Sequence, residues 1–145
     1  MVMIRKIQPE DIDEVMQIWR NGNLTAHNFI NSKYWFDNYE KVREEYLPKA
    51  DTWIYIEADT IKGFVSVVEN NYIGALFIEK QFQRDGIGTI LIKHCKNLYD
   101  KLSLKVYKKN EGAISFYNTM GFESVSSQVD KDTNELEYIM EWNKK

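Results

Sequence analysis

Two closely spaced glycines, Gly86 and Gly88, constrain this chain more than any other feature, because they join an apolar run to a helical pattern. The apolar run covers residues 72–78, and the helical pattern continues to about Tyr99. A strand that turns into a helix leaves several backbone N–H groups unpaired and pointing the same way, and the helix dipole makes that place attractive to anions. Glycine also lets the main chain approach a bulky ligand closely. The segment 83–89 is therefore a candidate phosphate-binding loop.

The Gly-x-Gly spacing alone does not identify a ligand, because many strand-to-helix turns carry two glycines for tight packing. Two common phosphate-binding patterns are absent. The chain contains no Gly-x-x-x-x-Gly-Lys-Ser/Thr segment, and the dinucleotide pattern Gly-x-Gly-x-x-Gly fails because Leu91 stands where the third glycine belongs. Other parts of the chain must decide between packing and phosphate binding.

Length and composition indicate a single globular domain, residues 1–145. The chain is long enough for a substantial core, and 43% of it is hydrophobic. The net charge of −3 offers no basic face for nucleic acid, whereas it suits a cationic amine as substrate. No apolar run approaches the roughly 18 residues of a membrane helix, and no signal-peptide layout is present. The single cysteine, Cys95, has no disulfide partner and no metal-ligand pattern around it, so we expect a cytoplasmic protein without a metal site.

Hydrophobic periodicity predicts the order of strands and helices. Apolar alternation and β-branched runs predict strands over residues 3–7, 53–58, 61–68, 72–78, 102–107, 122–129 and 136–142. Helical spacing predicts a first helix that begins at Pro9 and ends near Gly22, a second over residues 37–46, a third after the glycine loop and a fourth between Asn110 and Gly121. The third helix should face the sheet through Ile87, Ile90, Leu91, His94, Cys95 and Leu98. Because this helix connects strands 72–78 and 102–107, those strands should run parallel.

A cluster rich in aromatic residues lies between the first two predicted helices. It comprises His27, Phe29, Ile30, Tyr34, Trp35 and Phe36. Rings with polar edges suit a substrate pocket and ordinary core packing equally well, and the sequence leaves both interpretations open.

A second motif follows strand 102–107 and reads Asn110-Glu111-Gly112-Ala113-Ile114-Ser115-Phe116-Tyr117-Asn118-Thr119-Met120-Gly121-Phe122. Together, Gln-x-x-Gly-x-Gly and Asn-x-x-Ala-x-x-Phe-Tyr-x-x-x-Gly-Phe at this separation resemble the GNAT family of acetyl-CoA-dependent N-acetyltransferases. The resemblance implies an α/β (α+β) fold with a mixed, mostly antiparallel sheet of about seven strands, about four helices, and a V-shaped splay between strands 4 and 5. The segment 27–30, with Tyr34 and Trp35 after it, resembles a subgroup of small bacterial members, some of them regarded as protein-lysine acetyltransferases.

The resemblance also implies where acetyl-CoA binds. The pantetheine arm would bond to the backbone of the strand before the loop, at Leu76, Phe77 and Ile78. The pyrophosphate would bind the loop, at Gln83, Arg84, Asp85, Gly86, Ile87, Gly88 and Thr89. Asn110 would contact the arm as well as cap the fourth helix. Ala113 and Phe116 complete the expected cofactor site, although Phe116 also suits packing.

Acyl transfer from a thioester to an amine needs a neutral amine and an acid for the departing thiolate. Tyr117 occupies the family's position for that acid, and a phenol suits the task because its hydroxyl can donate to sulfur as charge builds. The alternative is a core tyrosine in an amphipathic helix. No general base is evident, because Tyr72 stands where some family members carry a glutamate. His27 is a candidate for orienting the substrate or taking a proton, and ordered water is an equal candidate.

Two functions are therefore expected to compete. The first is an acetyl-CoA-dependent N-acetyltransferase in which a primary amine attacks the bound thioester directly in a ternary complex, the amine belonging to a protein lysine, a protein N-terminus or a small molecule. The second is a non-catalytic acyl-CoA-binding sensor or interaction module. Either one is compatible with a monomer or a homodimer.

Overall fold

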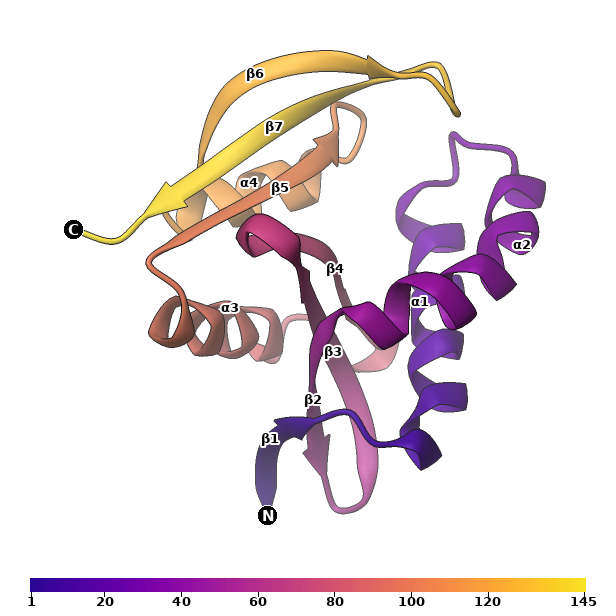
Figure 1. Ribbon diagram of the computed structural model, residues 1–145, viewed down its shortest axis with the longest axis vertical. Helices are drawn as coiled ribbons and strands as arrows, with labels where there is room; N and C mark the ends of the chain where they lie inside the picture. Colours follow the sequence, from indigo (N-terminus) through magenta and orange to yellow (C-terminus); the bar gives the residue numbers. More distant parts are fainter.

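A computed structural model describes residues 1–145 and places seven strands in one sheet, in the order β1-β2-β3-β4-β5-β7-β6 (Figure 1). The strands are β1 (Val2–Lys6), β2 (Asp51–Glu57), β3 (Thr60–Val68), β4 (Tyr72–Ile78), β5 (Lys101–Tyr107), β6 (Glu123–Asp130) and β7 (Glu135–Asn143). The helices are α1 (Ile12–Ala26), α2 (Ser32–Lys41), α3 (Ile87–Leu98) and α4 (Glu111–Thr119). Every strand pair is antiparallel except β4 with β5. The predicted fold and the parallel pair are confirmed.

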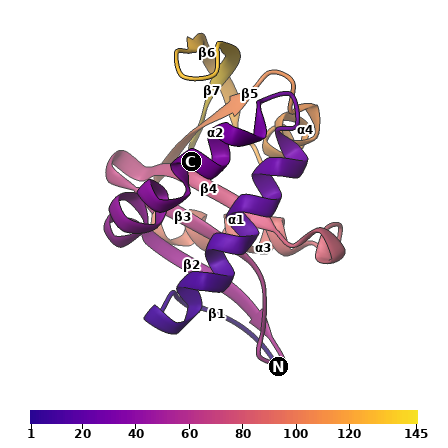
Figure 2. The same ribbon diagram turned by 90° about the vertical axis from the view of Figure 1, so that its right-hand side faces the viewer.

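The helices cover both faces of the sheet, and each face has its own core. Helices α1 and α2 lie in front of the sheet in Figure 2 and pack on Ile54 and Phe64. Helices α3 and α4 pack on the other face, where they meet Val65 and Leu104. Because side chains alternate along a strand, Phe64 and Val65 belong to opposite cores, which explains why β3 is apolar almost throughout.

Strands β4 and β5 separate almost as soon as they meet. Their only paired position is Tyr72 with Ser103, whereas β5 pairs with β7 over its whole length. Figure 1 shows β5, β7 and β6 crossing at a steep angle to β2, β3 and β4. The predicted splay between strands 4 and 5 is therefore confirmed, and it leaves most of one edge of β4 without a strand partner.

The first two helices differ from their predicted limits. Helix α1 continues past Gly22 to Ala26, because this glycine serves close packing rather than chain reversal: a Cβ there would lie 2.3 Å from Cδ1 of Phe77. Helix α2 begins at Ser32 instead of residue 37, because the Asn31 side chain caps it by accepting from a backbone N–H 2.9 Å away. Helix α1 is thus longer than predicted, whereas α2 begins earlier and ends at Lys41, and a π-helical turn over Val42–Tyr46 completes the predicted segment.

Helix α3 faces the sheet through a slightly different stripe from the predicted one. Ile92 is fully buried beside Leu91, whereas Ile90 and Leu98 are 41% and 52% exposed. The buried positions are 87, 91, 92 and 95. The face of α3 that contacts the sheet therefore includes Ile92, which the prediction left out, and leaves Ile90 and Leu98 to solvent.

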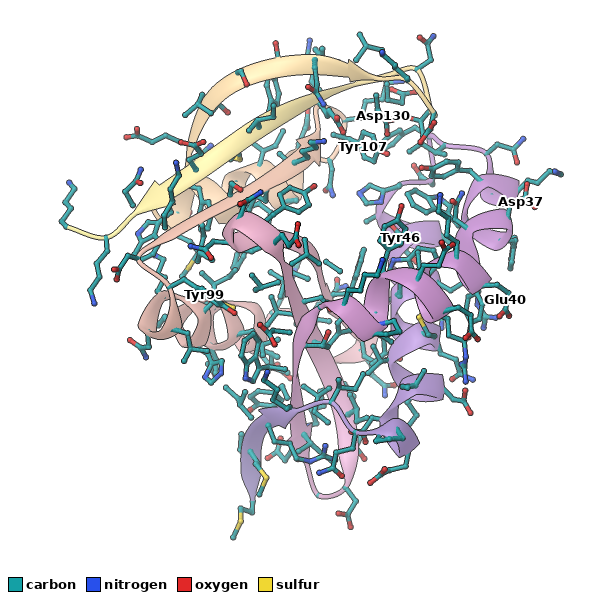
Figure 3. All side chains as sticks on the ribbon, in the orientation of Figure 1. Asp37, Glu40, Tyr46, Tyr99, Tyr107 and Asp130 are labelled. Carbon is teal, nitrogen blue, oxygen red and sulfur yellow. The ribbon has the colours of Figure 1, made fainter.

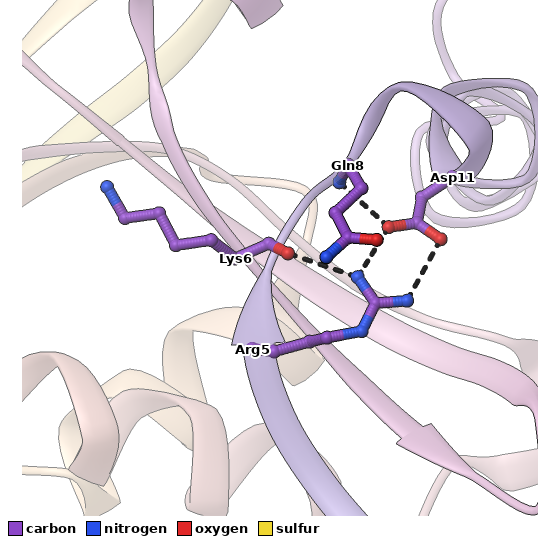
Figure 4. Close-up of polar contacts among 4 residues, drawn as sticks. All are labelled: Arg5, Lys6, Gln8 and Asp11. Carbon is purple, nitrogen blue, oxygen red and sulfur yellow. Dashed lines mark hydrogen bonds and ion pairs between the residues drawn. The ribbon is translucent and has the colours of Figure 1, made fainter.

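A bidentate ion pair fixes where α1 starts relative to β1 (Figure 4). Asp11 is 5% exposed and accepts from Nη1 and Nη2 of Arg5 over 2.7 and 3.2 Å, while the Gln8 N–H donates to it over 2.8 Å. These hydrogen bonds, led by those from Arg5, hold the pKa of Asp11 below its ordinary value. The direction in which α1 leaves β1 is thereby set, and its C-terminal half points to the splay.

Candidate active site

The glycine loop presents free backbone donors at the start of α3. Gly86 is the N-cap residue, has φ +80°, and no side chain caps the helix behind it. The N–H groups of Ile87, Gly88 and Thr89 therefore have no partner within the helix. A Cβ on Gly86 would meet nothing within 4 Å, so the loop is open on that side. The loop fits a phosphate group, which these N–H groups and the helix dipole would hold.

The second glycine of the loop is required for a different reason. A Cβ on Gly88 would lie 3.3 Å from Cζ of Phe116, which is tighter than an ordinary contact. Gly86 is thus needed for its left-handed backbone and Gly88 for the close approach of α3 to α4. The packing interpretation accounts for Gly88, but it does not account for the open space around Gly86.

The free edge of β4 exposes backbone groups at alternate residues. The Glu79 N–H donates to the Lys62 carbonyl of β3 over 2.8 Å, so the carbonyl of Ile78, in the same peptide unit, points away from β3. It accepts from Nε2 of Gln83 over 3.1 Å. The Phe77 carbonyl instead faces β3, 3.0 Å from where a Cβ on Gly63 would lie. Of the three predicted arm-binding residues, Leu76 and Ile78 direct their backbone toward the splay and Phe77 does not.

One cavity of about 580 Å³ occupies the splay and extends to the aromatic cluster. Of its 29 lining residues, 21 are hydrophobic. Predicted site residues in its wall are His27, Leu76, Phe77, Asn110, Ala113 and Tyr117. The glycine loop, Ile78 and Phe116 lie outside it. Because Tyr34 and Trp35 also line the cavity while Phe36 is 53% exposed, the aromatic cluster serves partly as pocket wall and partly as packing.

Tyr117 projects from α4 into this cavity as a protonated donor. Its side chain is 9% exposed, and its hydroxyl makes no hydrogen bond within the protein. The rings of Phe116 and Phe122 contact its ring edge to face. Burial raises the pKa of Tyr117 well above its ordinary value, because the phenolate would be poorly solvated. At neutral pH Tyr117 therefore has a proton to donate.

His27 belongs to a chain of hydrogen bonds that links α1 to α4. Nδ2 of Asn23 donates to the Trp19 carbonyl over 3.0 Å, which turns its Oδ1 toward Nδ1 of His27, 2.8 Å away. Nε2 of His27 lies 3.2 Å from Nδ2 of Asn110. The Asn110 Oδ1 accepts from the Ala113 N–H over 3.3 Å, so its amide nitrogen must be the donor to His27. Both ends of this chain are backbone groups, and they fix His27 as the neutral tautomer with its proton on Nδ1.

These contacts leave His27 poorly suited to accept a proton. Burial lowers its pKa to about 4, because the imidazolium would be desolvated. Its acceptor nitrogen is already used by Asn110, so a new proton there would break the link to α4. The geometry favours a role for His27 in positioning Asn110.

This pKa shift predicts a pH dependence of stability. Between pH 6.5 and about 4, the unfolded chain binds a proton at His27 that the folded chain does not, so the free energy of unfolding should fall as the pH falls. From pH 7 to 5 the loss should be about 2 kcal/mol. Urea titrations at both pH values on the wild type and His27→Gln measure it, because the variant should lose less by that amount. The variant should still lose some stability, because it retains His94 and burial lowers the pKa of that residue as well. An equal loss in both proteins would contradict the prediction.

Several cavity residues were not predicted from the sequence, because only the register of the sheet brings them together. Tyr107 ends β5, and the register places Glu137 of β7 opposite it. The Tyr107 hydroxyl donates to Oδ2 of Asp130 over 2.8 Å, and Figure 3 shows the two side chains next to one another at the far end of the β6–β7 hairpin. Tyr46, which follows α2, faces them across the cavity. The position of Tyr107 at the carboxyl end of a parallel strand was the one available signal, since ligands in open sheets bind there.

The chain has neither a metal-binding cluster nor a membrane-spanning helix. No group of three or more His, Cys, Asp or Glu side chains is placed to bind a metal ion. None of the helices has the length and apolar character needed to cross a bilayer.

Comparison with known proteins identifies the family. Residues 17–137 match the acetyltransferase (GNAT) domain model. The peptidyl-lysine N-acetyltransferase YiaC of Escherichia coli is 34% identical over 140 residues, which cover 97% of this chain and 96% of YiaC. The peptidyl-lysine N-acetyltransferase YjaB of the same organism is 30% identical over 131 residues, or 89% of this chain and 88% of YjaB.

Solved structures agree with this result. The solution structure of apo YjaB from Escherichia coli superposes with a TM-score of 0.85 at 25% identity, covering 100% of this chain and 99% of that one. The PaiA N-acetyltransferase from Thermoplasma acidophilum, solved in complex with coenzyme A, shares the fold with a TM-score of 0.82 at 18% identity and 99% coverage of both chains. The glycine loop, the splayed strands and the family match agree, so the chain belongs to the GNAT family and is an acetyl-CoA-dependent N-acetyltransferase.

Proposed function

We propose that this enzyme transfers the acetyl group of acetyl-CoA to the side-chain amine of a protein lysine, by direct attack in a ternary complex. The observation that carries the proposal is the single cavity in which the free edge of β4 and Tyr117 meet an aromatic wall and two carboxylates. One continuous space allows donor and acceptor to be present together, as direct attack requires. The naming of YiaC and YjaB as peptidyl-lysine N-acetyltransferases supports the lysine acceptor.

In this proposal the cofactor-binding residues divide into two groups. Backbone N–H groups from Arg84 to Thr89 hold the pyrophosphate, and Gln83 begins the loop. Leu76 and Ile78 bind the pantetheine arm through the backbone that faces the splay. Asn110, Ala113 and Phe116 border the arm from α4, while Phe77 contributes the ring that packs on α1.

The protein itself contributes a buried cavity, one proton donor and one positioning residue. Acetyl-CoA supplies the activated acyl group, and the buried cavity strengthens the electrostatic effect of every dipole in it. Tyr117 donates its proton to the sulfur as the thiolate departs. His27 holds Asn110 in the orientation that the arm requires. A water molecule takes the proton from the acceptor amine.

We also propose that the enzyme is cytoplasmic and has no nucleic-acid partner. The single cysteine is buried and unpaired, which agrees with the reducing cytoplasm. The net charge of −3 argues against nucleic acid as a partner.

A panel of amines tests the acceptor class. Thiol release from acetyl-CoA is followed with an N-terminally blocked lysine peptide, with the same peptide carrying norleucine and a free N-terminus, and with spermidine. We expect release with the lysine peptide alone. Release with another amine instead would overturn the lysine assignment. CoA binding without release by any amine would favour the non-catalytic sensor.

A further inference from the structure

Glu137 is a buried carboxylate in the cavity that lacks a cationic partner. It is 7% exposed, and the pairing of β6 with β7 places it opposite Gln128, whose Nε2 donates to Oε2 over 2.7 Å. Its Oε1 makes no hydrogen bond within the protein and stays open to the cavity, and no Lys, Arg or His forms an ion pair with it. A carboxylate buried in this way opposes folding unless a positive group reaches it. This arrangement indicates a ligand with a positive charge.

The other charged residues of the cavity do not supply that partner. Asp130 uses both oxygens within the protein, Oδ2 accepting from the Tyr107 hydroxyl over 2.8 Å and Oδ1 from the Asp132 N–H over 3.0 Å. These bonds hold the β6–β7 turn. Lys105 is the only cationic residue in the cavity wall, and it forms an ion pair with neither carboxylate. Between the two carboxylates, Glu137 alone has an oxygen without a hydrogen bond within the protein.

The rest of the wall suits a cation on an alkyl chain. The aromatic residues near the carboxylates are Tyr34, Trp35, Tyr46, Tyr72 and Tyr107. Their rings offer apolar surface to methylene groups and π faces to a positive charge. Burial, followed by the charges of Glu137 and Asp130, raises the pKa of Tyr72 to about 12. Tyr72 and Tyr117 line the same cavity as the two carboxylates.

The location of Glu137 follows from the sheet. Tyr107, Glu137 and Gln128 share one face of the β5-β7-β6 ladder, because they lie opposite one another. The neighbouring Val106 and Met140 point to the other face, where α3 and α4 cover them. Glu137 therefore reaches the splay from the side opposite to the helix that carries Tyr117, which leaves the space between them for an acceptor.

Building on the proposed acetyltransferase function, we propose that Glu137 is the residue that recognises the acceptor amine, and that it binds the ammonium group at the end of the lysine side chain. Oε1 of Glu137 accepts an N–H of the ammonium as it binds, and the alkyl chain lies among the aromatic rings. The nitrogen loses one proton to water and becomes neutral before it attacks the thioester, and it loses the second proton to water after the attack. Neutral aryl amines and amines beside an acidic group are disfavoured, because the cavity offers them a buried negative charge.

Glu137→Gln tests the proposal, with Glu141→Gln as a matched control. Glu141 lies on the same strand and the same face, but it pairs with Lys101 outside the cavity. We expect Glu137→Gln to raise the KM for a blocked lysine peptide about tenfold, with kcat and the KM for acetyl-CoA within twofold of wild type. The control should leave all three unchanged. Tm should stay the same or rise in Glu137→Gln, because an uncompensated buried charge is removed.

A binding measurement separates this inference from the function on which it rests. Calorimetric titration of the lysine peptide into protein saturated with CoA, which cannot react, should give a Kd about tenfold weaker for Glu137→Gln than for wild type. If wild type turns over no amine, the proposed function fails, and this titration still decides the role of Glu137. A KM and a Kd within twofold of wild type, or equal losses in Glu141→Gln, would overturn the inference.

Discussion

Tyr117→Phe should lower kcat by about 100-fold while the Kd for CoA stays nearly unchanged. The substitution removes only the hydroxyl, which makes no hydrogen bond within the protein, so the packing on Phe116 and Phe122 is retained. General acid catalysis contributes roughly 100-fold or more, and the departing thiolate would have to leave without a proton. Steady-state thiol release measures kcat, and calorimetry measures the affinity for CoA.

Tyr99→Phe provides the control for this substitution. Tyr99 lies beside α3, away from the cavity, and its hydroxyl is 3.5 Å from Asp51 (Figure 3). The same chemical change there should leave kcat within twofold of wild type. A Tyr117→Phe enzyme with wild-type turnover would remove Tyr117 from the role of acid. An equal loss of kcat and of CoA affinity would instead indicate that the hydroxyl helps to bind the cofactor.

The parts of this protein that the sequence predicted well are those whose causes are local. Strand β4 matches its predicted limits because its apolar run and its turns are adjacent in the chain. The glycine loop and the Asn110 cap were recognisable because capping and left-handed turns depend on a few neighbouring residues. Alternation and capping are thus sufficient to predict the frame that carries the site.

The errors came from contacts between distant residues. Gly22 looked like a helix end, and only its contact with Phe77 of β4 shows that it is an interior packing position. The bond between His27 and Asn110 joins residues separated by 83 positions. Glu137 lies in the predicted strand 136–142 but was not recognised as a site residue, because its burial depends on the splay and on the register with Tyr107. The acceptor wall is therefore a product of tertiary structure, and periodicity alone does not predict it.

Gly86→Ala should weaken CoA binding about 50-fold. An alanine that keeps φ at +80° is strained, and its methyl group occupies the open side of the loop. An alanine whose backbone relaxes turns the N–H groups of Ile87 and Gly88 away from the phosphate. Either outcome removes one or two hydrogen bonds to a charged phosphate, each contributing about 1.5–3 kcal/mol. Calorimetry with CoA measures the loss.

Gly121→Ala separates this effect from backbone strain. Gly121 follows α4 with φ +92°, and a Cβ there would lie 3.5 Å from Cδ1 of Trp142, an ordinary contact. Both variants should lose about 1 kcal/mol of stability, because both force alanine into the left-handed region. Only Gly86→Ala should lose affinity for CoA. S-acetylpantetheine, a donor without the pyrophosphate, should be used by Gly86→Ala with nearly wild-type kcat/KM, because its binding depends on β4 and α4 alone. A normal Kd for CoA in Gly86→Ala, or an equal loss with S-acetylpantetheine, would show that the loop does not bind the pyrophosphate.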